Sequence, residues 1–482
     1  MLRTRLGFPA PRPRRSLWLE QALADERDPI AAPPLAGTER SDVCVVGGGY
    51  AGLWTAIRVK QADPSLDVVI LEADICGGGA SGRNAGFALS WWVKAHALVD
   101  LCGTDDGAWL ARESEAAIDE IGSFATEHGL DIGYEKQGWL WGSTSDAQYG
   151  AWADTVEFAA GLGSTAYQEI SAEEFRERSG SPAYTGGVLD RSGAIVQPAR
   201  LARGLRKVAL DLGVRIFENS PVESLTTATR PAVATPQGRV DAAKVIFAIG
   251  SWSGRIEQLK ALRRAMVIVS SDAIATEPIP DLLAHYGPRG HEGVSDSRLM
   301  VRYARTSEGR MIFGVPGQHF AYGTLIGRSY EYGARRTAYI TDAFREVYPD
   351  LAAARITHAW GGPVDRTDAG VPIFGTLPES KDVVYGAGYS GNGLGPAVFA
   401  GHILTSLALE RDDRWASHGL IRSPAAAFPP EPFRYVGGML VKHSVRRFEE
   451  RHDAGKRVSW PVRTLAGLAP AGLVKDSGDV GH

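Results

Sequence analysis

The chain has 482 residues, and 57 of them are glycine, about 12% against the roughly 7% of average usage. Its composition, 44% hydrophobic and 22% charged, excludes a disordered or fibrous protein, and its net charge of −4 argues against a nucleic-acid partner, which a basic surface would have to hold. At roughly 150 residues per domain, the length allows about three domains, or two large ones with elaborations. The surplus of glycine is therefore expected in folded loops.

Cysteine usage and hydropathy bear on the compartment. Cys44, Cys76 and Cys102 show neither a metal-binding spacing nor a disulfide framework, and no cluster of metal ligands is apparent. This usage is typical of a reducing compartment, so we expect a cytoplasmic protein without a bound metal. No apolar run reaches the roughly 18 residues of a membrane span, so we expect no transmembrane segment.

The first ordered unit follows an extension rich in proline and arginine, residues 1–40, which is expected to drape over the surface. Residues 42–46 read as a buried strand, residues 51–61 as a helix and residues 67–71 as a second strand. Strand, helix and strand within about 30 residues predict a βαβ unit.

A glycine motif joins the first strand to the helix. Gly47, Gly49 and Gly52 fit the G-x-G-x-x-G pattern, and Glu72 ends the next strand. In this context the glycines permit a tight turn, close approach to a pyrophosphate and close helix packing, while the acid can accept hydrogen bonds from ribose hydroxyls. The motif predicts a dinucleotide but does not separate NAD from FAD.

Two further glycine clusters favour FAD. Residues 77–86 follow the second strand, where a loop can wrap the flavin end of a long cofactor. Residues 386–396 lead into a helix, whose N-terminus can stabilise negative charge on a reduced flavin.

The rest of the chain alternates between helical and strand-like patterns. Further helices are expected at about 105–130, 199–212, 331–347 and 397–410, and further strands at 134–142, 214–217, 244–249, 264–273, 298–304 and 310–315. Residues 411–482 form a tail with a basic amphipathic stretch at 434–457, whose apolar face could meet a partner, a membrane surface or the parent domain.

Four segments together resemble the D-amino-acid-oxidase-like (glycine/sarcosine oxidase) family of FAD-dependent oxidoreductases, in its gamma-glutamylputrescine-oxidase-like branch. They are residues 43–53, residues 71–73 with 80–86, residues 245–252, and residues 360–375 with 386–395. The resemblance implies an α/β FAD-binding Rossmann-like domain of the glutathione-reductase type, interleaved with an α+β substrate domain on a mostly antiparallel sheet. It places the FAD-binding domain at 41–95, 185–255 and 355–410 and the substrate domain at 96–184 and 256–354, between the extension at 1–40 and the tail at 411–482.

The resemblance also implies a set of site residues. Those expected to bind FAD are Gly47, Gly49, Tyr50, Ala51, Gly52, Glu72, Ala73, Ser81, Gly82, Arg83, Asn84, Ala85, Gly86, Val222, Gly250, Trp252, Gly388, Tyr389, Ser390, Gly391, Asn392, Gly393 and Leu394. Trp360, Tyr303 and His319 are expected at the reaction site, within an aromatic cage that Trp91, Trp92 and Tyr322 would complete. The last cysteine is Cys102 and residues 81–86 include no histidine, so we expect FAD to be bound noncovalently.

An arginine often binds the substrate carboxylate in members that act on α-amino acids, beside the segment that here runs from Trp360 to Asp368. Pro363 stands where a charged contact would be expected and Arg366 comes later, which argues against an α-amino acid. Arg298 or Arg302, on an expected strand, could instead bind an anionic group.

The activity that the resemblance implies is oxidation of the C–N bond of a primary or secondary amine, such as an amine, amino acid or aminophosphonate. Hydride passes to flavin N5, the imine hydrolyses to an aldehyde or keto product, and O2 reoxidises the flavin with release of H2O2. One alternative is a dehydrogenase of the same fold that passes electrons to a protein or quinone. Another is a noncatalytic flavin-bearing subunit of a complex. The sequence leaves open a homo-oligomer or a peripheral contact through the C-terminal tail.

Overall fold

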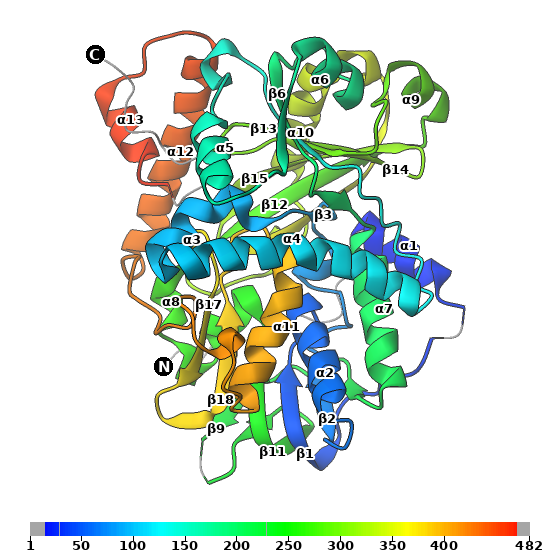
Figure 1. The fold of residues 1–482 in the computed structure, drawn as a ribbon, viewed down its shortest axis with the longest axis vertical. Helices are drawn as coiled ribbons and strands as arrows, with labels where there is room; N and C mark the ends of the chain where they lie inside the picture. Colours follow the sequence, from blue (N-terminus) through cyan, green and yellow to red (C-terminus); the bar gives the residue numbers. More distant parts are fainter. Residues whose placement is uncertain (1–14, 28, 228, 470–482) are drawn as a thin grey trace.

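Two eight-stranded sheets organise the molecule, one in each half of Figure 1. The computed structural model describes residues 15–27, 29–227 and 229–469. The first part of the predicted N-terminal extension, residues 1–14, and the end of the predicted tail, residues 470–482, lie outside the described residues.

The first sheet has a parallel centre in the order β18-β11-β1-β2-β8. Its strands are β1 (Gly37–Val46), β2 (Val68–Leu71), β8 (Arg215–Phe217), β9 (Ser224–Thr226), β10 (Ala232–Ala234), β11 (Gly238–Phe247), β17 (Ile373–Leu377) and β18 (Ser380–Ala387). In the last part of β1, residues 43–46, every residue is apolar and buried, because elements cover both faces of the sheet there, whereas residues 37–40 are not buried.

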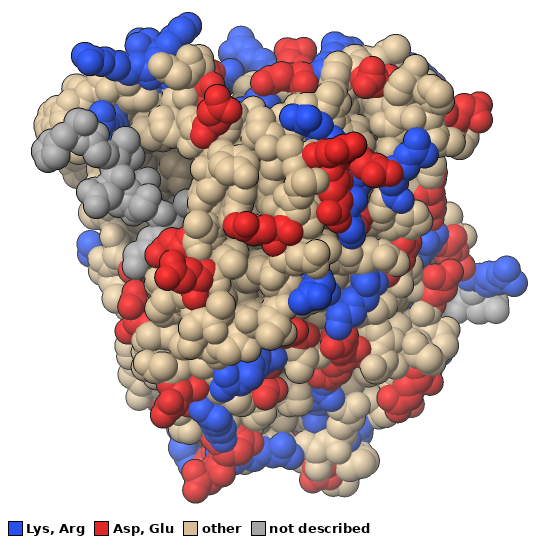
Figure 2. Space-filling model, turned by 45° about the horizontal axis from the view of Figure 1, so that its top comes forward, with Lys and Arg blue, Asp and Glu red and all other residues tan. Residues whose placement is uncertain are grey.

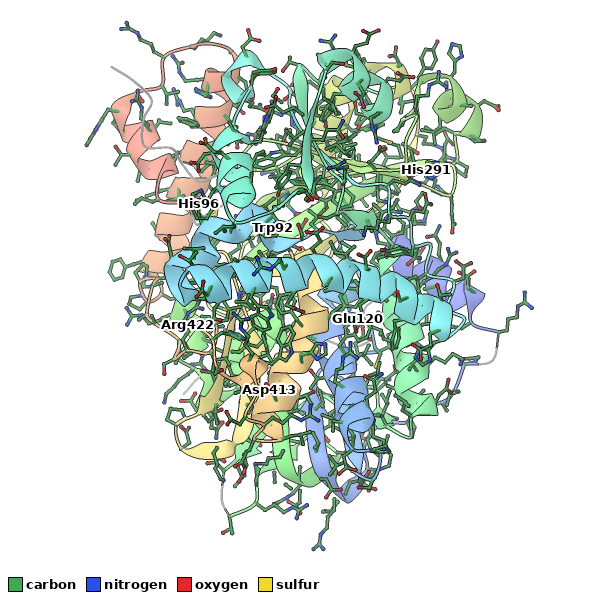
Figure 3. All side chains as sticks on the ribbon, in the orientation of Figure 1. Trp92, His96, Glu120, His291, Asp413 and Arg422 are labelled. Carbon is green, nitrogen blue, oxygen red and sulfur yellow. The ribbon has the colours of Figure 1, made fainter. Side chains whose placement is uncertain are left out.

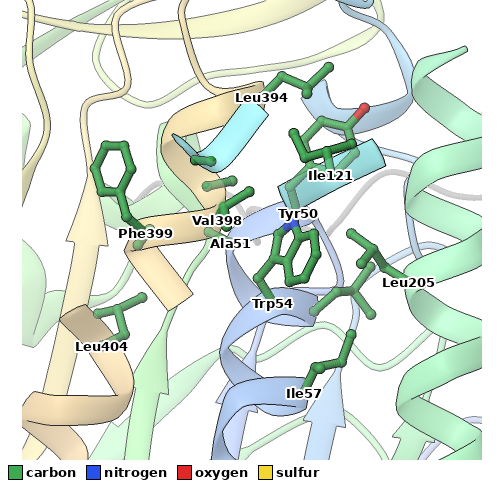
Figure 4. Packing of buried hydrophobic residues seen from close by; sticks show 14 of the residues in the cluster. Tyr50, Ala51, Trp54, Ile57, Ile121, Leu205, Leu394, Val398, Phe399 and Leu404 are labelled. Carbon is green, nitrogen blue, oxygen red and sulfur yellow. The ribbon is translucent and has the colours of Figure 1, made fainter. Parts of the chain in front are cut away.

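Helices α2 (Tyr50–Ala62), α4 (Thr104–Glu127), α7 (Pro198–Asp211) and α11 (Leu394–Ala408) form the layer beside this sheet (Figure 1). Their core is shown in Figure 4, where Trp54 of α2 is surrounded by apolar residues from the neighbouring helices. Trp54 is fully buried and lies edge-on to Phe124 of α4. This packing fixes the position of the first turn of α2.

The second sheet has the order β16-β12-β15-β14-β13-β4-β6-β5, and every pairing is antiparallel except that of β13 with β4. Its strands are β4 (Trp139–Ser143), β5 (Tyr167–Ile170), β6 (Gly186–Asp190), β12 (Met266–Thr276), β13 (Gly293–Asp296), β14 (Tyr303–Ser307), β15 (Arg310–Phe320) and β16 (Ile356–Thr367). The predicted fold class is confirmed. β6 and β16 pair within this sheet, although the sequence places both segments in the FAD-binding domain.

Further elements complete the fold. They are α3 (Ala95–Cys102), α5 (Ala153–Gly161), α6 (Ala172–Ser179), α8 (Leu262–Ala265), α9 (Pro280–Tyr286), α10 (Ala334–Val347), the paired strands β3 (Phe87–Ala88) and β7 (Ala194–Ile195), and the turn η2 (Trp91–Lys94). Of these, α6, α9 and α10 belong to the half of the second sheet.

The N-terminal extension contains a helix where the sequence analysis expects only a surface loop. Helix α1 (Leu17–Asp25) begins after Ser16, whose hydroxyl accepts a hydrogen bond from the Leu19 amide at 3.1 Å. Trp18 is fully buried and meets Trp360 of β16 edge-on, with 6.0 Å between ring centroids. The extension is therefore part of the core between α7 and β16.

The C-terminal tail folds back onto the second sheet. Helices α12 (Phe433–Asp453) and α13 (Trp460–Ala466) pack on one another, and Val445 and Phe448 join the core cluster beneath β15. Of the three interpretations of the amphipathic stretch, contact with the parent domain accounts for its inner face. Among the described helices, none has both the length and the apolar character needed to cross a membrane.

Candidate functional site

A cavity of about 690 Å3 lies among the ends of both sheets. It is lined by β1, β2 and the loops before α2 and α11 on one side, and by β12, β14 and β16 on the other. The predicted site residues that line it are Gly47, Gly49, Tyr50, Ala51, Glu72, Ala73, Ser81, Arg83, Asn84, Ala85, Val222, Gly250, Trp252, Tyr303, Tyr389, Ser390, Gly391, Asn392, Gly393 and Leu394. One cavity is thus lined by residues of all three glycine clusters.

The first glycine motif forms one end of the cavity. Gly47 has φ +113°, and a Cβ atom on it would lie 2.6 Å from the Ala248 carbonyl oxygen. The Glu72 carboxylate accepts hydrogen bonds from the Gly48 amide at 2.7 Å and the Asp74 amide at 2.8 Å. Gly49 caps α2 without a side-chain hydrogen bond. The Tyr50 amide donates to the Ser81 hydroxyl at 2.9 Å, and the amides that follow in the first turn remain available to an anion.

Four predicted glycines lie behind the cavity wall instead of lining it. A Cβ atom on Gly52 would lie 1.9 Å from the Gly47 carbonyl oxygen, and one on Gly82 would lie 2.3 Å from that of Gly77. Gly86 and Gly388 both have positive φ and are equally closely packed. These glycines allow the lining loops to approach the helices and strands behind them.

The loop before α11 leaves polar atoms without partners at the cavity. Both polar side-chain atoms of Asn392 and the hydroxyl of Tyr389 are buried and accept or donate no hydrogen bond within the described residues. Asp365 supports this loop by accepting a hydrogen bond from the Gly388 amide at 2.6 Å, and burial raises the pKa of its carboxyl to about 6. Unsatisfied buried polar atoms are costly, so the loop fits a polar ligand such as a flavin ring edge.

Two cations, Lys94 and Arg366, also line the cavity, although neither is among the site residues predicted from the sequence. Lys94 ends the turn η2, whose position is fixed by a hydrogen bond from the Trp91 amide to the Ser114 hydroxyl at 2.7 Å. Arg366 lies on β16, and its Nε atom is buried without a hydrogen-bond partner in the described chain. Burial and the charge of Arg366 lower the pKa of Lys94 to about 7.

The two arginines considered as anion ligands are engaged elsewhere. Arg298 is paired with Asp296 at 2.7 Å and with Asp453 at 2.6 Å, and Arg302 with Glu346 at 3.0 Å. Neither lines the cavity. The strand expected at 298–304 begins only at residue 303, because the Asp296 carboxylate accepts the backbone amides of both arginines and holds them in a loop.

Only one member of the expected aromatic cage, Tyr303, lines the cavity. Its hydroxyl lies 3.1 Å from that of Ser271, another lining residue, and its ring meets Phe87 edge-on. Burial raises the pKa of Tyr303 to about 12, so the hydroxyl keeps its proton at neutral pH. The sequence does not mark Phe87 or Ser271 as site residues. Phe87 only follows a glycine cluster, and Ser271 only lies on an expected strand.

The other aromatic candidates lie away from the cavity lining. Trp360 is 2% exposed, packs on Trp18, and donates its indole N–H to the Arg83 carbonyl at 2.9 Å. His319 packs against Tyr330, and burial lowers its pKa. Trp91 and Trp92 belong to the core, where Trp92 beside α4 (Figure 3) donates to Glu115 at 2.7 Å, and Tyr322 is exposed on the surface. Trp360 and His319 can therefore act on a bound molecule only through the residues that line the cavity.

The lining suits a cofactor held without a covalent bond. In the part of the chain that the structure describes, no cysteine or histidine lines the cavity. Cys76 is buried behind Gly48, and Cys102 lies at the end of α3 near Gly419. Noncovalent binding of FAD stays a prediction that this arrangement supports.

Comparisons with known proteins agree with this site. The family model described as "DAO: FAD dependent oxidoreductase" matches residues 42–407. Gamma-glutamylputrescine oxidoreductase of Escherichia coli strain K12 is 29% identical over 408 residues, covering 82% of this chain and 91% of the relative. A probable oxidoreductase, OrdL, of Rhizobium meliloti strain 1021 is 30% identical over 401 residues, covering 81% and 88%.

The fold also matches a solved structure. The crystal structure of glycine oxidase from Geobacillus kaustophilus superposes with a TM-score of 0.66 at 21% identity, covering 80% of this chain and 99% of that one. The family match, the open helix N-terminus at Gly49 and the unsatisfied polar atoms before α11 point to the same cofactor. The chain belongs to the DAO family of FAD-dependent oxidoreductases.

Proposed function

We propose that this chain oxidises the C–N bond of a primary or secondary amine that also carries an anionic group, such as an amino acid, an aminophosphonate or a γ-glutamyl amine. The overall reaction takes the amine, water and O2 to an aldehyde or keto compound, ammonia or a shorter amine, and H2O2. The observation that carries the proposal is the presence of Lys94 and Arg366 together in the wall of the FAD cavity.

The two cations support an anionic group on the substrate. A cation beside a buried cation raises the free energy of the empty site, and the lowered pKa of Lys94 reports that repulsion as well as burial. A carboxylate or phosphonate between them would remove the repulsion and give Arg366 an acceptor for its buried Nε. This supports an anionic substrate and includes an α-amino acid, against which the position of Arg366 in the sequence argued.

The remaining wall can orient the amine. Bound FAD would supply the two-electron acceptor for the C–N oxidation. The hydroxyls of Tyr303 and Ser271 face the cavity and can hold the nitrogen in its neutral form by hydrogen bonding. Phe87, Val301 and Pro316 provide an apolar wall that lowers the pKa of a bound ammonium group. The relatives' printed names, glycine oxidase and gamma-glutamylputrescine oxidoreductase, agree with an amine that carries a carboxylate.

The test is anaerobic bleaching of the flavin absorbance with matched pairs of amines. One pair is glycine with methylamine and the other is γ-glutamylputrescine with putrescine, and aminomethylphosphonate extends the series. We expect bleaching only by the anionic member of a pair. Equal bleaching by both members would contradict the anionic requirement, and no bleaching by any amine would contradict amine oxidation.

Variants of Arg366 and Lys94 test whether these two residues bind the anionic group of the substrate. Arg366→Gln and Lys94→Met should each raise the apparent Kd of the bleaching substrate about ten- to a hundredfold, as loss of one charge-assisted hydrogen bond implies. Arg302→Gln, outside the cavity lining and paired with Glu346, is the matched control and should leave the Kd unchanged. Flavin content must match the wild type in all three. The H2O2 formed per turnover in air then separates an oxidase from a dehydrogenase of the same fold.

A further inference from the structure

Exposed apolar side chains are concentrated at the C-terminal helices. Of the eleven large apolar side chains exposed in the described chain, seven lie on α12, on the segment at and just after α13, or in the loop that packs beside α12. These seven are Tyr322, Leu325, Phe433, Val436, Leu440, Trp460 and Leu468, and we call them the C-terminal apolar face. Trp460 is 75% exposed and Phe433 70%. So much exposed apolar surface in one region is typical of a contact site.

Along α12 these residues form a stripe that the parent domain does not cover. Phe433, Val436 and Leu440 recur at the spacing of one helical face, while Val445 and Phe448 occupy the inner face against β15. Tyr322 joins the stripe through its ring contact with Tyr435, at 5.7 Å between centroids. The helix is thus anchored on one side, and its apolar outer stripe is held in place before any ligand arrives.

The same region carries a strong positive charge. Residues 433–469 contain eight lysines and arginines against three acids, whereas the whole chain has a net charge of −4. All three acids already have partners. Asp453 pairs with Arg298 and Glu449 accepts the Met300 amide, both on the inner side, while Glu450 pairs with Arg446 on the surface of α12.

Four cations of the tail remain at the surface. Arg447, Lys456, Arg457 and Arg463 are exposed, and within the described residues no acidic side chain pairs with them. Basic side chains gather along the upper left edge of Figure 2, in the part of the molecule where Figure 1 places α12 and α13.

We propose that this C-terminal face docks the protein on the surface of an anionic lipid membrane. Aromatic and aliphatic side chains enter the boundary between headgroups and acyl chains, and arginine and lysine beside them meet the negative headgroups. Charge complementarity favours a lipid surface of negative charge, because the exposed cations of the tail lie beside its exposed apolar side chains. The inner face of α12 needs no rearrangement for this contact.

The test uses the full chain with FAD bound and two kinds of vesicle, phosphatidylcholine alone and phosphatidylcholine with phosphatidylglycerol. We expect cosedimentation with the anionic vesicles only, and loss of binding as salt concentration rises. Arg447→Glu with Arg457→Glu should weaken binding about tenfold or more, since each basic residue near such a surface contributes a several-fold effect. Phe433→Ser with Trp460→Ser should also weaken it.

Matched controls separate docking from folding. Ile30→Ser with Tyr286→Ser removes exposed apolar side chains outside the C-terminal apolar face and should bind as the wild type does. All variants should keep the flavin content and thermal midpoint of the wild type. Absence of binding to either vesicle, or equal binding to both, would overturn the proposal. A wild-type dimer in solution that Phe433→Ser with Trp460→Ser dissociates would assign the face to a second copy instead.

Discussion

The charge of the cavity depends on pH through Lys94, because the pKa of Lys94 is about 7, within the pH range in which binding can be measured. Burial and Arg366 both lower this pKa, so the empty site favours the neutral amine above pH 7. An anionic ligand reverses the preference, since it stabilises the protonated form and raises the pKa when it binds. Binding therefore takes up a proton above pH 7 and none below it.

We predict that the Kd of a simple carboxylate such as propionate rises above pH 7, by up to about tenfold per pH unit. Propionate is chosen because it has no amine to titrate, and its binding is measured by the change in flavin absorbance. Lys94→Arg keeps its charge at every pH and should bind with little pH dependence. A parallel rise in the wild type and Lys94→Arg would show that another group controls the binding.

At the scale of elements, the cofactor motifs could be predicted and the cation pair could not. Gly47, Gly49, Gly52 and Glu72 lie within one βαβ unit, so their spatial arrangement follows from local sequence. Lys94 and Arg366 come from η2 and β16, and only the packing of the two sheets brings them to the same wall. The order of residues along β16 shows neither which ones line the cavity nor what faces them.

The helix α1 was missed for a different reason, because its local signal was available. Ser16 is a favourable N-cap, and Leu17, Trp18 and Ala22 share the buried face of the helix that follows. The density of proline and arginine upstream favoured a loop. The position of Trp360 depends on this helix, since Trp18 packs against it where a substrate contact had been expected.

Gly52 in the first turn of α2 packs against the turn that follows β1. Gly52→Ala would place a Cβ atom 1.9 Å from the Gly47 carbonyl oxygen, so α2 must move away from the turn that precedes it. We expect a loss of stability of about 1 to 3 kcal/mol and a marked fall in FAD content, because the amides at the N-terminus of α2 move with the helix. Urea unfolding and the ratio of flavin to protein absorbance measure the two effects.

The control for that substitution is Gly161→Ala at the end of α5. No atom lies within 4 Å of the added Cβ, and Gly161 has no positive φ. Its FAD content should equal that of the wild type, with stability unchanged or slightly higher. Full FAD content in Gly52→Ala would mean that the turn can relax without disturbing the cofactor.

For the whole molecule, the cavity couples the two sheets, since β1 and β2 line it from one side and β12, β14 and β16 from the other. A ligand that binds this cavity stabilises both halves, and the free energy of unfolding rises by about 2.7 kcal/mol when the ligand concentration is a hundred times the Kd.

Because no cysteine or histidine of the described chain lines the cavity, we also expect acid precipitation to release the flavin into the supernatant. Yellow colour that stays with the precipitate would contradict noncovalent binding.

The contact of the cavity with both sheets also predicts how added FAD changes the thermal unfolding of the protein. If the cofactor bridges the sheets, FAD should raise the midpoint of the whole transition and make it a single cooperative step. Differential scanning calorimetry measures this directly. Binding to the first sheet alone would shift only part of the heat absorption and leave a second transition, from the half that contains α10 and α12, at its original temperature. In the Gly52→Ala protein the cofactor site is displaced. Its unfolding midpoint should therefore not rise at the same FAD concentration.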